Sequence, residues 1–199
     1  MVPSHRVVSQ VLPDYALKAN GGRVLMSLTS VSGGLFASRD DDPALAIDDD
    51  VHAGRCWRSR ALPSQLGIRL SRILRPSHVS IEHAPAEVVM DVGQAPKNLT
   101  LWGLVDGMTN VALFQGLLRS YPMDHPARRA PEIAKSFLWA PLTSFSYDIY
   151  SEHVVQTFPI ALLFIDSGMS FGIVVLEILD NWGGDATCLY RVRVHGTEV

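Results

Sequence analysis

The feature that most constrains the fold of this 199-residue sequence is a two-residue alternation of apolar and polar side chains. Leu66, Ile68 and Leu70, for example, are each separated by a single polar residue or glycine. Successive side chains of a strand point to opposite faces, so this pattern predicts a strand with one buried face. The same alternation occurs over residues 78–82, 98–101 and 190–195. We therefore expect an all-β fold.

Other segments extend this prediction to a compact β-sandwich. Residues 173–179 form a nearly continuous apolar run, which is typical of a central strand. Residues 145–150 and 154–158 flank a three-residue connection, which is the spacing of a β-hairpin. Twelve prolines and fifteen glycines are spread along the chain, as expected for short strands joined by turns. Several such strands separated by turn signals indicate a sandwich.

Residues 154–176 are apolar enough to raise the question of a membrane span. The stretch contains Pro159 and Asp166, and an unpaired carboxylate inside a bilayer costs several kcal/mol. We interpret it instead as two buried strands around a turn at residues 166–168, so no membrane span is expected. Helical signals are few. One short helix is predicted over residues 130–138, within a long surface excursion over residues 116–143.

The composition limits the classes of function. Hydrophobic residues make up 47% and charged residues 19% of the chain, which favours one packed domain over disorder. The formal net charge of -3 gives no electrostatic support for a nucleic-acid partner. The sequence has no nucleophile elbow, no phosphate-binding loop and no zinc-protease motif, and its seven histidines lack metal-ligand spacing. We therefore predict that the chain is not an enzyme.

The two cysteines, Cys56 and Cys188, allow two interpretations. Neither belongs to a C-x-x-C pair, so a zinc site is not expected. They can be two buried thiols, since cysteine is often simply buried. They can also form one long-range disulfide, which would require an oxidising compartment.

Four stretches, taken together, resemble the SUN-domain family. The first is Asp-Tyr-Ala-Leu-Lys at residues 14–18, and the second is Asp-Val-His-Ala-Gly-Arg-Cys-Trp at residues 50–57. The third is Ile-Glu-His at residues 81–83, followed by Ala-Pro-Lys at 95–97 and Trp-Gly at 102–103. The fourth runs from Asn181 to Gly196 and includes Thr-Cys-Leu-Tyr-Arg-Val-Arg-Val-His-Gly. The resemblance covers residues 14–196 in order.

The resemblance implies a fold and a function. It implies a jelly-roll or galactose-binding-like β-sandwich over residues 14–199, with a short lid, at most one or two short helices and an N-terminal extension at residues 1–13. SUN domains lie on the perinuclear side of the inner nuclear membrane, assemble as homotrimers and bind the C-terminal tail of KASH proteins. This pair forms the LINC complex, which links nucleus to cytoskeleton. The alternative is a lumenal β-sandwich that binds carbohydrate or another ligand without binding KASH proteins.

The resemblance also implies specific residues. It pairs Cys56 with Cys188 in a disulfide, and it assigns His83, Gln94 and Tyr190 to a pocket for the peptide's terminal carboxylate. Gln94 stands where animal members carry a serine. An imidazole, an amide and a phenol can all bind a carboxylate without burying a fixed charge.

A second implied site is a cation loop. In the family, main-chain carbonyls ring a monovalent ion, expected to be potassium, and we assign this role to Leu45, Asp48, Asp50, Arg55 and Tyr190. The neighbouring aspartates favour a cation, whereas Arg55 replaces an asparagine of animal members and opposes it. No other cofactor is expected, and the alternative is a solvated acidic loop without an ion.

Two departures from animal members bear on the function. Only residues 1–13 precede the domain, so we expect neither a transmembrane helix nor a trimerising coiled coil from this chain. Residues 24–43 take the place of the family's lid over the peptide. This segment is shorter than in animal members and has no cysteine, so an interchain disulfide to the peptide is not expected.

Overall fold

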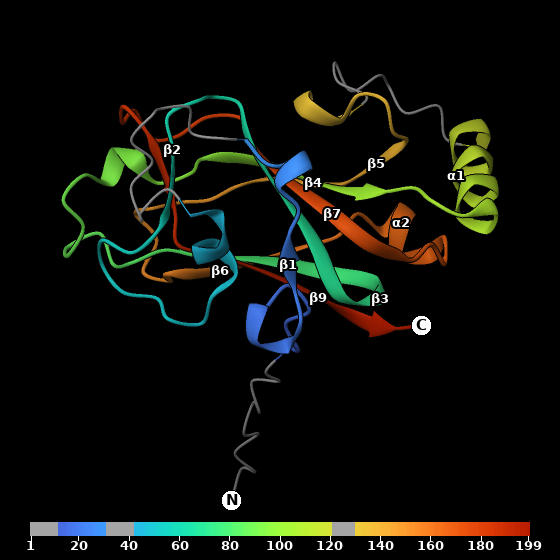
Figure 1. The fold of residues 1–199 in the computed structure, drawn as a ribbon, viewed down its shortest axis with the longest axis horizontal. Helices are drawn as coiled ribbons and strands as arrows, with labels where there is room; N and C mark the ends of the chain where they lie inside the picture. Colours follow the sequence, from blue (N-terminus) through green and yellow to red (C-terminus); the bar gives the residue numbers. More distant parts are fainter. Residues whose placement is uncertain (1–11, 31–41, 121–129) are drawn as a thin grey trace, which may run out of the picture.

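The computed structural model describes residues 12–30, 42–120 and 130–199, and these ranges form a mostly β structure (Figure 1). Within them lie nine strands and two α-helices. The strands are β1 (Arg23–Val24), β2 (Trp57–Ser59), β3 (Ser64–Glu82), β4 (Asn98–Leu104), β5 (Trp139–Ser146), β6 (Val155–Pro159), β7 (Phe171–Ile178), β8 (Thr187–Leu189) and β9 (Arg191–Glu198). The α-helices are α1 (Met108–Ser120) and α2 (Leu162–Asp166), and 3-10 turns include Pro43–Ile47, Val92–Gln94 and Glu132–Ala134.

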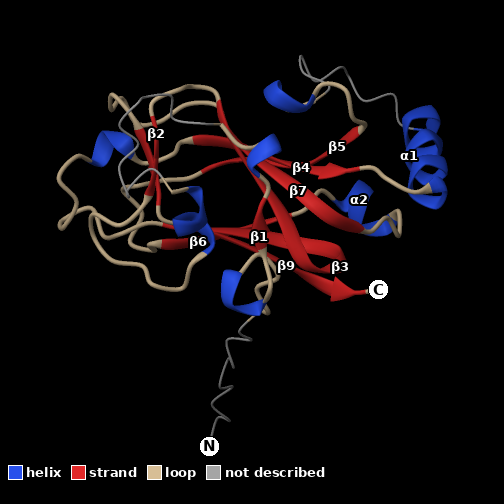
Figure 2. Ribbon diagram, viewed as in Figure 1, coloured by secondary structure: helices blue, strands red, loops and turns tan. Residues whose placement is uncertain are grey.

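Strand β3 contributes to both layers of a β-sandwich (Figure 2). Its first half pairs with β1 and β7, and that sheet continues through β4 to β5. Its second half pairs with β6 on one side and β9 on the other. Register shifts between Arg69 and Leu74 and between Pro76 and His78 separate the halves. Irregularities of this kind bend a strand, so one 19-residue strand can serve both layers.

The predicted alternation buries the core between these layers. The inward-facing apolar side chains of both halves of β3 are fully buried and pack in one cluster with those of β4, β7 and β9. Each such side chain stabilises the fold by about 1.5–3 kcal/mol. The cluster includes Leu66, Ile68, Val79, Ile81, Leu99, Leu101, Leu176, Val192 and Val194. The all-β sandwich prediction is confirmed.

A second, smaller sheet lies at the end of the sandwich away from α1 (Figure 1). It consists of β2 and β8, which pair antiparallel with Arg58 opposite Cys188. The chain enters β2 directly from the loop that contains Asp48 and Asp50, and it passes from β8 through Tyr190 into β9. The small sheet therefore brings three of the sequence's suspected functional segments to one end of the molecule.

The predicted hairpin of residues 145–150 and 154–158 is wrong in its strand pairing. Strand β5 pairs with β4, whereas β6 pairs with the second half of β3. The connection is nevertheless a tight turn, because the Gln156 amide donates to the carbonyls of Asp148 and His153 at 2.6 and 3.2 Å. The bend in β3 leaves an edge that β6 can extend, and β6 joins that edge instead of β5.

The interpretation of residues 154–176 as two buried strands is only half correct. Strand β7 is buried, but alternate residues of β6 are exposed, and α2 lies between the two strands. Helix α1 was not expected, and its start at Met108 precedes the predicted surface excursion. The short helix predicted over residues 130–138 is a 3-10 turn, Glu132–Ala134. Phe114 is the side chain of α1 that is fully buried, so the helical pattern in the sequence is weak.

Three expectations fall partly on residues outside the described ranges, one of them the surface excursion over residues 116–143, of which residues 121–129 lie outside. Most of the expected N-terminal extension, residues 1–11, and the central part of the expected lid, residues 31–41, lie there. Within the described ranges, no helix is long and apolar enough to cross a membrane.

Candidate functional site

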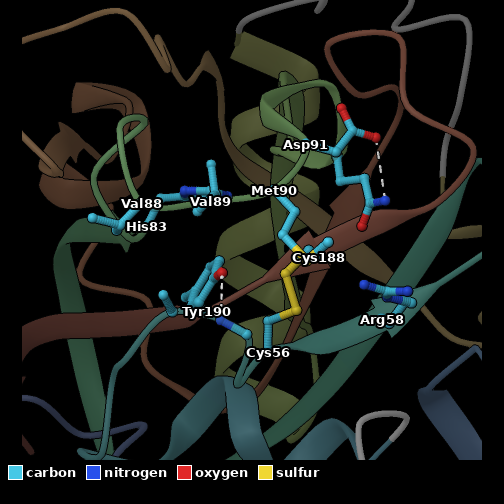
Figure 3. Close-up of a pocket in the computed structure, with 12 residues that line it drawn as sticks. Cys56, Arg58, His83, Val88, Val89, Met90, Asp91, Cys188 and Tyr190 are labelled. Atoms are coloured by element: carbon cyan, nitrogen blue, oxygen red, sulfur yellow. Dashed lines mark hydrogen bonds between the residues drawn. A yellow bond between two sulfur atoms is a disulfide. The ribbon is translucent and has the colours of Figure 1, made fainter.

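The disulfide between Cys56 and Cys188 lines a pocket at the β2–β8 end of the molecule (Figure 3). The two Cα atoms are 5.5 Å apart, within the range that a disulfide spans. The bond joins the residue before β2 to the middle residue of β8, over a sequence separation of 132. It therefore fixes the small sheet at the point where the suspected functional segments meet, and the predicted disulfide is confirmed.

The pocket has a volume of about 220 Å³ and is lined by His83, Gln94 and Tyr190, among others. These residues come from separate elements: His83 follows β3, Gln94 ends the Val92–Gln94 turn, and Tyr190 lies between β8 and β9. The structure thus brings together the three residues assigned to the peptide pocket. Their role in binding a carboxylate stays a prediction.

His83 carries a buried nitrogen without a partner. Its side chain is only 3% exposed, and Nδ1 lies 2.8 Å from the carbonyl oxygen of Ala84. A carbonyl can only accept, so Nδ1 carries the proton and the neutral ring presents Nε2 as an acceptor. Within the described residues, Nε2 has no hydrogen-bond partner. Burial lowers the pKa of His83, and the hydrogen bond to Ala84 only partly offsets this effect.

Tyr190 has a phenolic proton available beside that ring. Its hydroxyl oxygen accepts a hydrogen bond from the backbone N–H of Gly54 at 3.1 Å, which leaves the O–H to donate. The Tyr190 and His83 rings pack edge to face with their centroids 4.6 Å apart. Gly54 has φ +83°, which favours glycine because an L side chain rarely adopts this conformation. The turn at Gly54 therefore directs its N–H toward Tyr190.

Gln94 is less suited to hold a carboxylate than the sequence suggests. Its Nε2 group donates to Asp91 at 3.2 Å and to Asp185 at 3.3 Å. Both hydrogens of the amide are thus directed at carboxylates, and a third carboxylate would be repelled. Gln94 instead connects the Val92–Gln94 turn to the loop that precedes β8.

Arg58 is a pocket residue that the sequence did not single out. It lies in β2 and lines the same cavity, on the other side of the disulfide from His83 and Tyr190 (Figure 3). Exposed apolar side chains flank the cavity, with Val88 58% and Met90 106% exposed. Arg58 lies opposite Cys188 in the small sheet, but β2 has only three residues, so its alternation is too short to interpret from the sequence. The pocket therefore combines a cation, an unpaired acceptor, a phenolic donor and an apolar rim.

Four of the five residues assigned to the cation loop, all except Tyr190, lie in what we call the acidic loop, residues 45–55. The Arg55 guanidinium occupies its oxygen atoms: Nη1 lies 2.9 Å from the carbonyl oxygen of Asp50 and 2.6 Å from its Oδ2. Nη2 lies 3.1 Å from Oδ2 of Asp48. The carbonyl of Leu45 accepts from the N–H of Asp48. Cation binding here stays a prediction, and Tyr190 contributes its hydroxyl to this loop through Gly54.

The charge on Asp48 is favoured by these contacts. Burial alone would raise the pKa of this carboxyl, but hydrogen bonds from the backbone of Asp50 and Asp49, together with Arg55, outweigh it and lower the pKa. Asp48 is therefore an anion that faces a guanidinium at neutral pH.

The sequence of this chain matches the model of a known protein family. The model of the Sad1/UNC-like C-terminal family matches residues 36–124 and 127–198, which include the disulfide and the pocket. The chain belongs to the Sad1/UNC, or SUN, family. The resemblance noted from four sequence stretches is thereby confirmed, and no enzyme family is evident among the curated relatives.

Curated relatives of this SUN domain are considerably longer proteins. It is 29% identical over 217 residues to SUN domain-containing protein 2 of Mus musculus, and 30% identical over 200 residues to SUN domain-containing protein 1 of Homo sapiens. These matches cover 96% and 94% of this chain but only 25% and 22% of the relatives. The chain thus spans about a quarter of the length of these relatives.

Solved structures with the same fold include carbohydrate-binding modules. The family 32 module of Streptococcus pneumoniae EndoD matches with a TM-score of 0.59 and 12% identity, covering 93% of this chain and 100% of the module. The family 32 module of C. perfringens NanJ, solved with galactose, has a TM-score of 0.55 and 12% identity over 91% and 97% of the two chains. At such identity the likeness describes the galactose-binding-like fold alone.

Proposed function

We propose that this SUN domain binds the C-terminal tail of a KASH protein and acts as an adaptor between nucleus and cytoskeleton. The terminal carboxylate of the tail would enter the pocket above the disulfide. In the full-length setting of its relatives the domain would act as a homotrimer in the perinuclear space of the nuclear envelope. Family membership and the composition of the pocket support this proposal.

The observation that carries the proposal is the unpaired Nε2 of His83 beside the free phenolic proton of Tyr190. A buried polar atom without a partner costs free energy, so its persistence suggests a ligand that completes it. A carboxylate accepts from the Tyr190 hydroxyl, and it also accepts from Nε2 once His83 is protonated. Arg58 adds positive charge at the other end of the cavity.

The carbohydrate alternative has less support at this site. Sugar sites commonly present an aromatic ring face, whereas Tyr190 is only 4% exposed and its ring packs against His83. A pocket that ends at His83 and Tyr190 is instead suited to a chain terminus.

The test is the binding of a synthetic KASH tail, as the free acid and as the C-terminal amide. We expect the free acid to bind at least about tenfold more tightly, which is the size of one to two hydrogen bonds to a charged group. His83→Ala and Tyr190→Phe should each weaken the free acid by about tenfold and weaken the amide less, because hydrogen bonds to a neutral group are weaker than those to a charged group. His153→Ala, at an exposed histidine outside the pocket, is the matched control. Equal affinities across this set would refute carboxylate recognition at this pocket.

A further inference from the structure

The acidic loop contains its own positive charge. Three consecutive aspartates, residues 48–50, occur within eight positions of Arg55. The guanidinium contacts one carbonyl and two carboxylate oxygens of this loop, from Asp48 and Asp50. A planar guanidinium offers several N–H donors in a fixed arrangement, so it can satisfy oxygens that converge from different residues.

These contacts are partly protected from solvent. The Arg55 and Asp48 side chains are 29% and 24% exposed, whereas Asp50 is 61% exposed. The Arg55–Asp48 pair is therefore the less screened of the two, and Asp48 has further hydrogen bonds from the acidic loop's own backbone. By these contacts Arg55 joins the first part of the acidic loop to its last residue.

The acidic loop is also a wall of the pocket. Gly54 directly precedes Arg55, and its N–H donates to the Tyr190 hydroxyl at 3.1 Å. Cys56 directly follows Arg55 and carries the disulfide that lines the pocket. Any change that releases Arg55 therefore acts on two pocket-lining neighbours, Gly54 and Cys56.

We infer that the Arg55 guanidinium is the resident cation of the acidic loop, and that it holds Gly54 and Tyr190 in place without a soluble ion. The same oxygens would be available to a monovalent ion only if the guanidinium left them. Removing Arg55 takes the guanidinium from the carboxylates of Asp48 and Asp50, and His52 then remains as a contact of Asp50 at 3.0 Å. A soluble cation such as potassium would then be required to stabilise the acidic loop.

The first experiment measures thermal unfolding in potassium chloride and in tetramethylammonium chloride at equal ionic strength. We expect wild type to melt at the same temperature, within about 1 °C, in both salts. Arg55→Asn should melt about 3 °C or more below wild type in tetramethylammonium chloride, and potassium should restore at least half of that loss. Arg60→Asn, which removes an equal charge at an exposed arginine, should show no difference between the salts.

Two outcomes would overturn the inference. One is a wild type that potassium stabilises as much as it stabilises Arg55→Asn, and the other is an Arg55→Asn variant that neither melts lower nor responds to potassium. If Arg55→Asn does not fold, Arg55→Lys keeps the charge but loses the fork of donors, so it should show a smaller potassium response. The wild-type measurement tests the inference even without either variant.

A second readout rests on the proposed function. In tetramethylammonium chloride, Arg55→Asn should bind the free-acid KASH tail several-fold more weakly than wild type, and potassium should restore the affinity. Arg60→Asn should bind as wild type does in both salts. If wild type does not bind the tail, the proposed function fails, whereas the melting experiment still decides the role of Arg55.

Discussion

The rings of His83 and Tyr190 lie with their centroids 4.6 Å apart, although 107 positions separate the two residues in the chain. His83 offers an unpaired Nε2, and Tyr190 offers a phenolic proton. The neutral form of His83 can only accept at Nε2, because Nδ1 donates to the carbonyl of Ala84. A carboxylate also only accepts, so binding one at Nε2 requires a proton from solvent. Ligand binding and proton uptake are therefore coupled at this site.

This coupling predicts that the affinity for a free-acid KASH tail rises as the pH falls. The pKa of free His83 is lowered by burial, and a bound carboxylate would raise it, so the complex holds up to one proton more than its parts. Between those two pKa values the affinity should increase by up to about tenfold per pH unit. Below the lowered pKa of the free domain the increase should stop. Titration calorimetry from pH 8 to pH 5.5 measures the slope.

Two controls separate His83 from other groups. The C-terminal amide of the tail and the His83→Gln variant should both give flat profiles, whereas His153→Gln should keep the slope. Tyr147, whose ring centroid is 6.2 Å from that of His83, has its pKa raised to about 12 by burial and by the charges of Asp148 and Glu82, so it stays neutral throughout. A free-acid affinity that is constant over this range would exclude proton-coupled binding.

The stability of the free domain should depend on pH in the opposite sense. Burial lowers the pKa of both His83 and His195, so each histidine binds a proton more readily in the unfolded chain. The contribution of these two neutral histidines to stability is therefore fully present above the unfolded pKa of about 6.5, and it is lost as the pH falls below that value. We expect the free energy of unfolding to fall by about 1–3 kcal/mol between pH 7.5 and pH 5.5. Urea denaturation at the two pH values measures this, and equal values would contradict it.

Some of this arrangement could be predicted from the sequence and some could not. Alternation identified β4 and β9, because their apolar residues face one core. It divided β3 into two strands, since the polar stretch around Arg72 and the proline at 76 interrupt the pattern where the strand bends. The pairing of β6 could not be predicted, because local spacing indicates a hairpin and says nothing of a distant free edge. Helix α1 buries too few side chains to give a clear period.

In the candidate site, too, some features could be predicted from the sequence and others could not. The convergence of His83 and Tyr190 was expected from the family resemblance and not from any local pattern. The Gln94 side-chain amide donates a hydrogen bond to Asp185, which lies 91 positions away, and no local sequence pattern predicts that contact. Arg58 lies in a strand of three residues, too short for alternation to orient its side chain.

Removal of the disulfide should destabilise the domain and disorder the pocket. Cys56→Ser combined with Cys188→Ser releases a loop closed over 132 positions, and we expect a loss of about 2–5 kcal/mol in the free energy of unfolding. Urea denaturation under non-reducing conditions measures it. Wild type treated with a reductant should match the double variant. A double variant as stable as oxidised wild type would show that packing alone holds the small sheet.

The ion pair between Asp14 and Arg191 should be needed to hold the start of β9, directly after Tyr190. The pair is 3.0 Å long, and its side chains are only 9% and 11% exposed. Asp14 also accepts from the N–H groups of Ala16 and Val194, so Asp14→Asn keeps an oxygen for these bonds and removes the charge.

Asp14→Asn leaves the Arg191 guanidinium buried without a counter-charge, and its Nε already has no partner within the described residues. Breaking a buried pair by removing one partner typically costs about 3–5 kcal/mol, and we expect a loss of this size in urea denaturation. The matched control is Lys135→Gln, because the Lys135–Glu132 pair is 67% and 53% exposed and exposed pairs contribute at most about 1 kcal/mol. Similar small losses for the two variants would mean that solvent screens the Asp14–Arg191 pair, and that packing of β9 alone positions Tyr190.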